Sequence, residues 1–178
     1  MKVIVIGEAG VGKSSLIRRI ATNKFEQSYL LTVGMDPTSV SIPLNGEGHR
    51  DFILNVWDIA GQKKFQIFKQ AFYRGAEAAV AVFDLTRPAS LEKLDEWITD
   101  FRARCGDKPV MLVGNKKDLQ DLISVTADEI TEFSQRHQTF TEVETSALTG
   151  EGVLDAFRSL VYERIGKPLN THPSQKIV

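Results

Sequence analysis

The feature that most constrains this sequence is the segment Gly7-Glu-Ala-Gly-Val-Gly-Lys-Ser14. It fits the pattern G-x-x-x-x-G-K-[ST] in full, and it lies between a β-branched run and a stretch with helical spacing. Glycines at positions 10 and 12 allow backbone angles that a Cβ would forbid, so successive N–H groups can turn toward a phosphate. The helix that follows adds its unpaired N–H groups. The residues expected to contact a phosphate chain are Gly10, Val11, Gly12, Lys13, Ser14 and Ser15.

Two side chains at the end of this segment have different expected tasks. Lys13 would neutralise the outer phosphates, which makes it a candidate catalytic residue. Ser14 would hold Mg²⁺ through its hydroxyl group. A chance glycine-rich turn is a poor explanation, because the strand before the segment and the helix after it are where the pattern requires them.

A second motif bears on the base of the nucleotide. Asn115-Lys-Lys-Asp118 follows the apolar run Val110–Val113 and matches N-K-x-D, which families with such a phosphate loop use for guanine. Asp118 can accept from guanine N1–H and from the 2-amino group, whereas adenine offers neither donor. A buried carboxylate would lose both partners with adenine, at about 1–3 kcal/mol each. We expect Asn115 to brace the loops and the stem of Lys116 to lie along the base. Taken alone, the four residues could also form an ordinary turn after a strand.

A third segment, "TSAL", Thr145 to Leu148, follows the last predicted strand. It would place the backbone N–H of Ala147 near the guanine oxygen, with Ser146 and Leu148 beside the base. By itself this segment would not establish a binding site.

The segment "WDIAGQ" and the loop "LTVGMD" carry the residues expected at the end of the phosphate chain. Asp58 suits a carboxylate that meets Mg²⁺ through water. Gly61 can bring its N–H onto the terminal phosphate, and Gln62 can orient an attacking water, so Gln62 is the second candidate catalytic residue. Thr32 could complete the metal shell with its hydroxyl group. Thr38 is a weaker candidate because it lies in a predicted strand.

Apolar runs alternate with stretches of helical period along the whole chain, which predicts an α/β fold. We expect a six-stranded, mostly parallel sheet covered by helices on both faces, with one antiparallel edge strand from a hairpin. The hairpin turn is predicted at Asn45-Gly-Glu-Gly48, and Thr126 to Glu129 reads as a capping box that opens a helix. The predicted strands are Val3–Ile6, Thr38–Leu44, Asp51–Asp58, Ala78–Phe83, Val110–Val113 and Phe140–Glu144. The predicted helical stretches are Ser14–Ala21, Leu91–Phe101 and Val153–Ile165.

Length and composition bound the remaining possibilities. A chain of 178 residues suits one domain, expected over residues 1–166, with a flexible tail over 167–178. The net charge of −1 without a run of like charges gives no basis for nucleic-acid binding. No stretch approaches the length of a membrane span, and strand-like residues begin at Lys2, which leaves no room for a signal peptide. Cys105 is the only cysteine, which rules out an internal disulfide and fits the reducing cytoplasm. We also expect a monomer.

At this point the chain resembles the small GTPases of the Ras superfamily, and most closely the Rab branch. The resemblance runs from about Lys2 to Gly166, and Phe25 and Tyr29 fall where the family places aromatic side chains beside the nucleotide. Its carriers, in family order, are GEAGVGKSS, TVGMD, WDIAGQKKF, FYRGAEAAVAVFDLT, VGNKKDL and TSAL. The resemblance implies the P-loop NTPase fold, GTP or GDP with Mg²⁺ as ligands, and possible regulation of membrane traffic or related signalling.

The sequence also departs from the family pattern. Ala9 stands where relatives carry glycine or serine, Ile59 and Lys63 replace the usual threonine and glutamate, and Leu148 replaces the usual lysine. The tail "KPLNTHPSQKIV" has no cysteine for prenylation. Either the native chain continues beyond this tail, or the protein reaches membranes only through a partner.

The hypothesis is therefore a GTP-dependent switch whose intrinsic hydrolysis is slow. A GTPase-activating protein, an exchange factor and effectors would bind through residues 25–44 and 59–75. The loop before Thr32 contains no arginine that could act as a finger, and Arg18 and Arg19 are expected to lie in solvent or at the edge of the core. Two alternatives stay open: a pseudo-GTPase that serves as an interaction module, favoured by Ala9 and Ile59, and an ATP-dependent small-molecule kinase, which leaves the N-K-x-D motif without a role.

Overall fold

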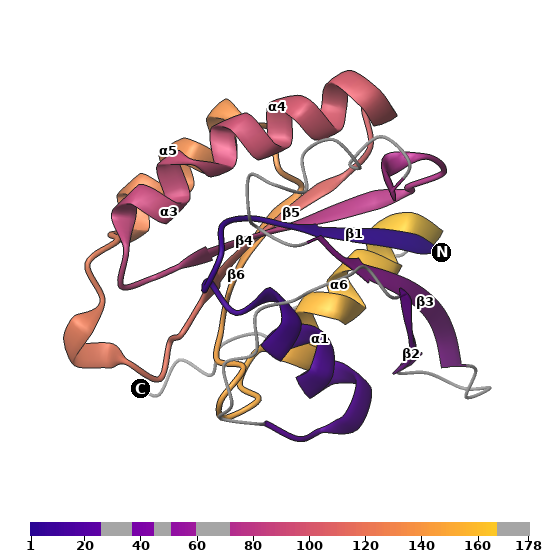
Figure 1. The fold of residues 1–178 in the computed structure, drawn as a ribbon, viewed down its shortest axis with the longest axis horizontal. Helices are drawn as coiled ribbons and strands as arrows, with labels where there is room; N and C mark the ends of the chain where they lie inside the picture. The colour runs from indigo at the N-terminus through magenta and orange to yellow at the C-terminus, as the bar shows by residue number, and fades with distance from the viewer. Residues whose placement is uncertain (26–36, 45–50, 60–71, 167–178) are drawn as a thin grey trace, which may run out of the picture.

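The computed structural model describes residues 1–25, 37–44, 51–59 and 72–166 (Figure 1). Strands and helices alternate along the chain, as the sequence predicts. The strands are β1 (Lys2–Ile6), β2 (Pro37–Pro43), β3 (Asp51–Asp58), β4 (Ala78–Asp84), β5 (Val110–Asn115) and β6 (Thr141–Thr145). The helices are α1 (Lys13–Thr22), α3 (Pro88–Glu92), α4 (Leu94–Cys105), α5 (Ala127–Arg136) and α6 (Val153–Ile165), with a short 3₁₀ turn η2 (Gln120–Leu122).

The six strands form one sheet in the order β2-β3-β1-β4-β5-β6. The pairs β1–β3, β1–β4, β4–β5 and β5–β6 are parallel, and β2 pairs with β3 antiparallel at one edge. This topology confirms the predicted fold class, including the antiparallel edge strand. The predicted hairpin turn at 45–48 lies outside the described residues.

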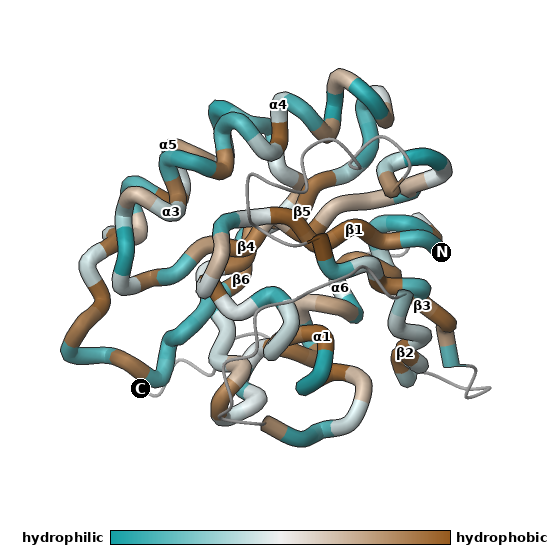
Figure 2. The backbone as a smooth tube through the Cα atoms, viewed as in Figure 1, coloured by the Kyte–Doolittle hydropathy of each residue, from teal (hydrophilic) through white to brown (hydrophobic). Residues whose placement is uncertain are grey.

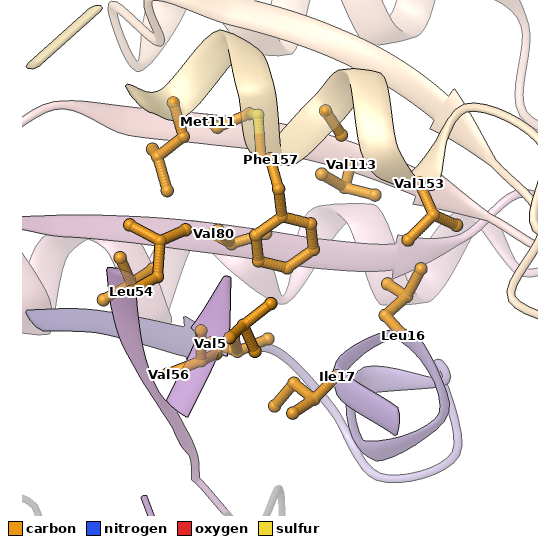
Figure 3. Packing of buried hydrophobic residues seen from close by; sticks show 14 of the residues in the cluster. Val5, Leu16, Ile17, Leu54, Val56, Val80, Met111, Val113, Val153 and Phe157 are labelled. Carbon is orange, nitrogen blue, oxygen red and sulfur yellow. The ribbon is translucent and has the colours of Figure 1, made fainter. Parts of the chain in front are cut away.

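Helices cover both faces of the sheet (Figure 1). On one face, α1 and α6 pack on side chains of the strands, and Figure 3 shows Phe157 of α6 pointing toward the sheet beside Val80 while Leu16 and Ile17 extend from α1. On the other face, α3, α4 and α5 enclose a second cluster that includes Phe83. The two clusters form the two halves of the core, one on each side of the strands.

The central strands are buried on both faces, and this explains their composition. Every residue of β4 and β5 is buried, and Figure 2 shows hydrophobic residues concentrated in these strands while hydrophilic residues prevail along α4 and α5. A parallel strand with helices on both sides has no solvent-facing side, so it reads as a continuous apolar run rather than as an alternation.

The predicted helices form, with one difference. The stripe over 91–101 is split into α3 and α4, which meet at Lys93, and the buried residues Leu91, Leu94, Ile98 and Phe101 still face one core. The capping box of α5 is confirmed, because Thr126 and Glu129 exchange both hydrogen bonds. Helical periodicity locates the buried face correctly but does not register a short interruption that leaves the face intact.

The register of the sheet brings the ends of several strands to one edge. Asp84 at the end of β4 lies opposite Asn115 at the end of β5, and Asn115 lies opposite Thr145 at the end of β6. Asp58 at the end of β3 is opposite Val5 of β1. Ligands of open α/β sheets bind beyond the carboxyl ends of the strands, so this edge is where a site is expected.

Within the described part of the chain, no helix has the length and apolar character needed to cross a membrane. The predicted tail, 167–178, lies outside the described residues, so the domain boundary at residue 166 stays a prediction.

Gly7 provides a test of how closely the chain must approach the sheet where β1 ends. Its φ is +138°, and a Cβ there would lie 2.2 Å from the carbonyl oxygen of Val82. We expect Gly7→Ala to lower the melting temperature strongly, since it combines backbone strain with a clash against main chain that cannot rotate away, at a cost of about 2–4 kcal/mol.

The matched control is Gly75→Ala, where φ is +75° and no atom of the described residues lies within 4 Å of the added Cβ. That variant carries backbone strain alone and should lose less stability. Equal melting temperatures for the two variants would contradict the close approach at Gly7.

Candidate functional site

The predicted phosphate-binding segment forms the loop between β1 and α1. Gly10 and Gly12 have φ values of 78° and 101°, the left-handed region that favours glycine. A Cβ on Gly12 would lie 2.1 Å from Asn115 Nδ2, so a side chain there would collide with the adjoining loop. The first turn of α1 begins directly after this glycine, which directs its N–H groups toward the loop. The backbone therefore has the left-handed angles that the predicted phosphate-binding turn requires.

Lys13 is held inside the loop. Its side chain is buried, with 6% of the residue exposed, and Nζ donates to the carbonyl oxygen of Glu8 at 2.7 Å. Burial lowers the pKa of Lys13 to about 8, although the nearby carboxylates of Asp58 and Glu8 act in the opposite direction. An anion placed beside this ammonium group would favour its charged form, so the loop is electrostatically suited to a phosphate.

Two of the three predicted metal ligands are together. The hydroxyl group of Ser14, in the first turn of α1, donates to Asp58 Oδ2 at the end of β3. Mg²⁺ prefers hydroxyl, carboxylate, phosphate and water oxygens, and these two side chains offer such atoms from separate elements. The donor set therefore fits the ion that the sequence predicts. Thr32, the third predicted ligand, lies outside the described residues.

Asn115 joins the three segments that the sequence singles out. Its Nδ2 donates to the carbonyl oxygen of Val11 at 2.9 Å, which ties β5 to the phosphate loop. Its Oδ1 accepts from the N–H of Ala147 at 3.1 Å and from Thr145 Oγ1 at 3.3 Å. Because Asn115 is 2% exposed, these bonds are made without competition from water. The predicted bracing role is thus visible as contacts on both sides.

The remaining base-motif residues are arranged around Asp118. Ser146 Oγ donates to Asp118 Oδ1 at 2.5 Å and accepts from the N–H of Thr149 at 3.1 Å, so the carboxylate is oriented by the neighbouring loop. Lys116 has a φ of 71°, an uncommon angle for a side-chain-bearing residue, and the next N–H, of Lys117, donates to Thr145 O at 3.0 Å. Asn115, Lys116, Asp118, Ser146 and Ala147 therefore form one unit.

Arg19 makes contacts that the sequence does not predict. Its side chain on α1 is half-buried, which agrees with the expected position in solvent or at the edge of the core. Arg19 donates through Nε to Ala147 O at 2.8 Å, to Leu148 O, and through Nη1 to Asn23 O at 2.9 Å. The guanidinium thus supports the base-binding loop from below. Nothing in the sequence points to this, because the partners are carbonyl groups more than 120 residues away.

The other predicted residues differ in how closely they can be placed. Ser15 lies in the first turn of α1. Phe25 follows α1 and packs against the core cluster on the face of the sheet that α1 and α6 cover. Leu148 is 47% exposed at the rim of the base loop. Ile59, which replaces a usual threonine, is fully buried in the core and donates its N–H to Val5 O. Tyr29, Gly61 and Gln62 lie outside the described residues.

Removal of the Asn115 side chain tests its bracing role. Asn115→Ala would leave the buried carbonyl of Val11 and the N–H of Ala147 without this partner, at a cost of about 1–3 kcal/mol for each unsatisfied group. We expect a melting temperature several degrees below wild type. Asn55→Ala is the control, because Asn55 is exposed on β3 and bonds only to Ser39 among the described side chains. Equal melting temperatures for the two variants would refute the bracing role.

Comparison with known proteins places the chain in a family. The model of the Ras family matches residues 2–165. The chain is 34% identical to Ras-related protein Rab-11A of Dictyostelium discoideum, over 99% of this chain and 83% of the relative. It is 37% identical to Ras-related protein Rab-18 of Caenorhabditis briggsae, over 94% and 82% respectively. It is also 35% identical to Ras-related protein rab-11.1 of Caenorhabditis elegans, over 96% and 80%.

The family model covers almost every described residue of the sheet and its helices, and the relatives align over most of both chains. The three relatives are Rab proteins, in agreement with the branch that the sequence motifs indicate. With the phosphate loop, the base loop and the sheet order as described, this chain belongs to the Ras family of small GTPases.

Proposed function

We propose that this protein is a guanine-nucleotide switch: it binds GTP with Mg²⁺, hydrolyses it slowly, and exchanges the product GDP for GTP. The observation that carries the proposal is the tie between Asn115 and the carbonyl of Val11. It joins the loop proposed for the phosphates directly to the loop proposed for the base. Family membership implies the guanine-nucleotide class, and these contacts support the residues that we propose for the site.

Recognition of the base is proposed for the unit around Asp118. The carboxylate accepts from guanine N1–H and from the 2-amino group. Ser146 holds this carboxylate in place, and Asn115 holds the N–H of Ala147. On binding, the N–H of Ala147, which here donates to Asn115 Oδ1, would come beside the guanine oxygen, and Lys116, Leu148 and the ring of Phe25 would flank the base. Adenine would present a lone pair, rather than a hydrogen-bond donor, to the carboxylate, so its binding would be much weaker than that of guanine.

Binding of the phosphates is proposed for the loop between β1 and α1. Lys13 and the backbone N–H groups of Gly10–Ser15 hold the anionic chain, and Ser14, Asp58 and Thr32 would hold Mg²⁺. Bound Mg²⁺ supplies neutralisation of the charge shared by the outer phosphates. Arrival of a ligand would replace the contact of Lys13 with Glu8 O and that of Ser14 with Asp58, so both side chains are prepared near their working positions.

Hydrolysis is proposed to depend on Gln62, which orients water for attack on the γ-phosphate, with Lys13 beside the developing charge and Gly61 contacting the same phosphate. Breaking the bond between the γ-phosphate and the β–γ bridging oxygen yields GDP and inorganic phosphate. Without an arginine finger in cis, intrinsic turnover is on the order of 10⁻⁴ s⁻¹. An activating protein would supply the missing cation.

The position of Ile59 bears on the alternative of an inactive family member. Its side chain is an ordinary core residue, so this departure is accommodated by packing on the face under α3 and α4. Ala9 is exposed at the outer edge of the phosphate loop, where its methyl group faces an incoming partner. The isoleucine at position 59 thus gives no support to a loss of hydrolysis, and the alanine at position 9 bears only on how a partner would fit.

The switch itself is proposed to lie in the segments 25–44 and 59–75, which regulators and effectors would read. Loss of the γ-phosphate would release Thr32 and Gly61 from their contacts and change both segments together. Regulation of membrane traffic or related signalling, from the cytoplasm and at membranes through a partner or a lipidated extension, follows from the resemblance to Rab proteins. This part of the proposal rests on that resemblance alone.

The specificity for guanine can be tested by removal of one carboxylate. We expect Asp118→Ala to weaken binding of fluorescent GDP by about 100-fold or more, since two hydrogen bonds to a charged acceptor are lost, and to narrow the preference for GDP over ADP. Competition titrations of labelled GDP with GDP and ADP measure both effects. Asp121→Ala, in the exposed turn η2 three residues further on, is the control and should bind as wild type does. Displacement of GDP from the wild-type protein by ADP and GDP alike would favour the kinase alternative.

The timer is tested by single-turnover hydrolysis of loaded GTP. We expect wild-type protein to hydrolyse GTP at a rate on the order of 10⁻⁴ s⁻¹ and Gln62→Leu to be slower, because the water loses its orienting group. Gln120→Leu, a substitution of an exposed glutamine in η2, should leave the rate unchanged. Hydrolysis within seconds would refute the slow timer. Absence of phosphate release over a day from protein that still binds GTP would establish the pseudo-GTPase.

A further inference from the structure

A buried carboxylate lies between the two nucleotide-binding loops and has no role in the function described so far. Asp84 is the last residue of β4, and its register partner in β5 is Asn115. It is 0% exposed, in a strand whose other residues are all apolar. A charge at this depth is costly unless it is paired and hydrogen-bonded, so its partners indicate why it is there.

The two oxygens of Asp84 face different groups. Oδ2 accepts from Lys116 Nζ at 2.6 Å and from Arg87 Nε at 3.0 Å. Oδ1 accepts from the N–H of Thr86 at 2.9 Å and from its hydroxyl group at 2.7 Å. Burial raises the pKa of Asp84, but the bonds from Lys116 and Thr86 outweigh it and bring the pKa below its usual value. The carboxylate is therefore charged, and it holds two cations that come from different segments.

The first cation belongs to the base loop. Lys116 is the lysine of the N-K-x-D motif, and its backbone has the uncommon φ of 71°. The ion pair with Asp84 sets the direction in which its long side chain leaves the backbone. A lysine side chain has several rotatable bonds. Because its Nζ is already fixed by Asp84, less conformational entropy is left to lose when a base binds along the stem.

The second cation reaches the phosphate loop. Arg87 Nη2 donates to the carbonyl oxygen of Ala9 at 3.3 Å, while Nε of the same guanidinium is bonded to Asp84. Nearby, Lys93 Nζ pairs with Glu8 at 2.9 Å, so two side chains from the chain after β4 contact adjacent residues of the loop. The carbonyl of Glu8 is the group that receives Lys13. Contacts from Asp84 thus extend from the base loop to the outer edge of the phosphate loop.

We propose that Asp84 is a positioning residue that couples the base loop to the phosphate loop, through Lys116 on one side and through Arg87 on the other. The proposal rests on the nucleotide-binding function argued above and deepens it by naming a residue that slows nucleotide release. Asp84 does not touch the nucleotide. It acts by fixing Lys116 along the base and by orienting Arg87 toward the carbonyl of Ala9.

The coupling predicts a faster release of nucleotide when the charge at position 84 is removed. Asp84→Asn keeps the shape of the side chain and an acceptor for Thr86, yet it removes the counter-charge of Lys116 and Arg87. Hydrogen bonds to charged groups are the stronger class, so we expect dissociation of fluorescent GDP in excess Mg²⁺ to accelerate about 10-fold or more. Arg87→Gln, at a half-exposed site, should accelerate it by a smaller factor.

The matched control is Glu77→Gln at the opposite end of the same strand. Glu77 immediately precedes β4, accepts from the N–H of Lys2 at 3.0 Å and pairs with Arg164 at 3.2 Å. It also has a lowered pKa, because of the hydrogen bond from the N–H of Lys2 and the contact with Arg164. This variant removes a carboxylate that is also hydrogen-bonded and ion-paired, although it is more exposed than Asp84, and it does so away from the carboxyl edge of the sheet. We expect it to release GDP at the wild-type rate.

A merely structural role for Asp84 is separated from coupling by a double-mutant cycle. If Asp84 acts through Lys116, Asp84→Asn should accelerate release much less when Lys116→Met is already present. A general loss of stability would instead multiply the two effects. Melting temperatures of all variants accompany the rates, and Arg87→Gln, on the surface, carries the test if Asp84→Asn does not fold.

Three outcomes decide between the possibilities. Faster release with Asp84→Asn and a sub-multiplicative cycle supports the coupling. A wild-type release rate for Asp84→Asn would overturn the coupling, and so would an equal acceleration by Glu77→Gln. If Asp84→Asn does not fold, a wild-type release rate for Arg87→Gln would overturn it instead. If the wild-type protein binds no guanine nucleotide at all, the proposed function itself fails, which is a distinct result.

Discussion

The site depends on a single amide side chain that joins the base loop to the phosphate loop. Asn115 bonds to Val11 on one side and to Ala147 and Thr145 on the other, at the point where β5 ends. These bonds are buried, so their loss would leave polar groups unsatisfied in a place that water does not reach easily. Because the sheet register already aligns the ends of β4, β5 and β6, one asparagine is enough to hold three loops in a fixed relation.

Around this asparagine, buried or half-buried polar groups perform the positioning. Ser146 orients Asp118, Arg19 supports the carbonyls of the same loop, and Asp84 directs Lys116 and Arg87. Each of these contacts crosses from one element to another. A nucleotide bound between the loops would therefore meet groups with little freedom left to lose, which would favour the tight binding and slow release that the proposed function requires. A switch of the proposed kind needs such retention, because release of GDP would set the lifetime of the GDP-bound state, while hydrolysis would set that of the GTP-bound state.

Much of this arrangement could be predicted from the sequence, because the motifs combine residue type with fixed spacing. The apolar runs of β4 and β5 predicted central parallel strands, and Gly12 and Asn115 were placed by motifs that require their backbone geometry or their amide. Contacts between distant segments could not be predicted in this way. Arg19 bonds to carbonyl groups, which every residue has, and Asp84 lies in a segment that carries the family resemblance but gives no indication of its partners. Such partners emerge only from the fold, because periodicity and motif spacing carry no information about which side chain reaches across the sheet edge.

The proposed function requires that guanine nucleotide occupies both loops at once. The most direct measurement is the identification, by chromatography after denaturation, of the nucleotide that remains with the purified protein in the presence of Mg²⁺. We expect close to one guanine nucleotide per chain, as GDP or GTP. Well-folded protein that carries an adenine nucleotide, or that carries none and takes up no added GDP, would contradict it.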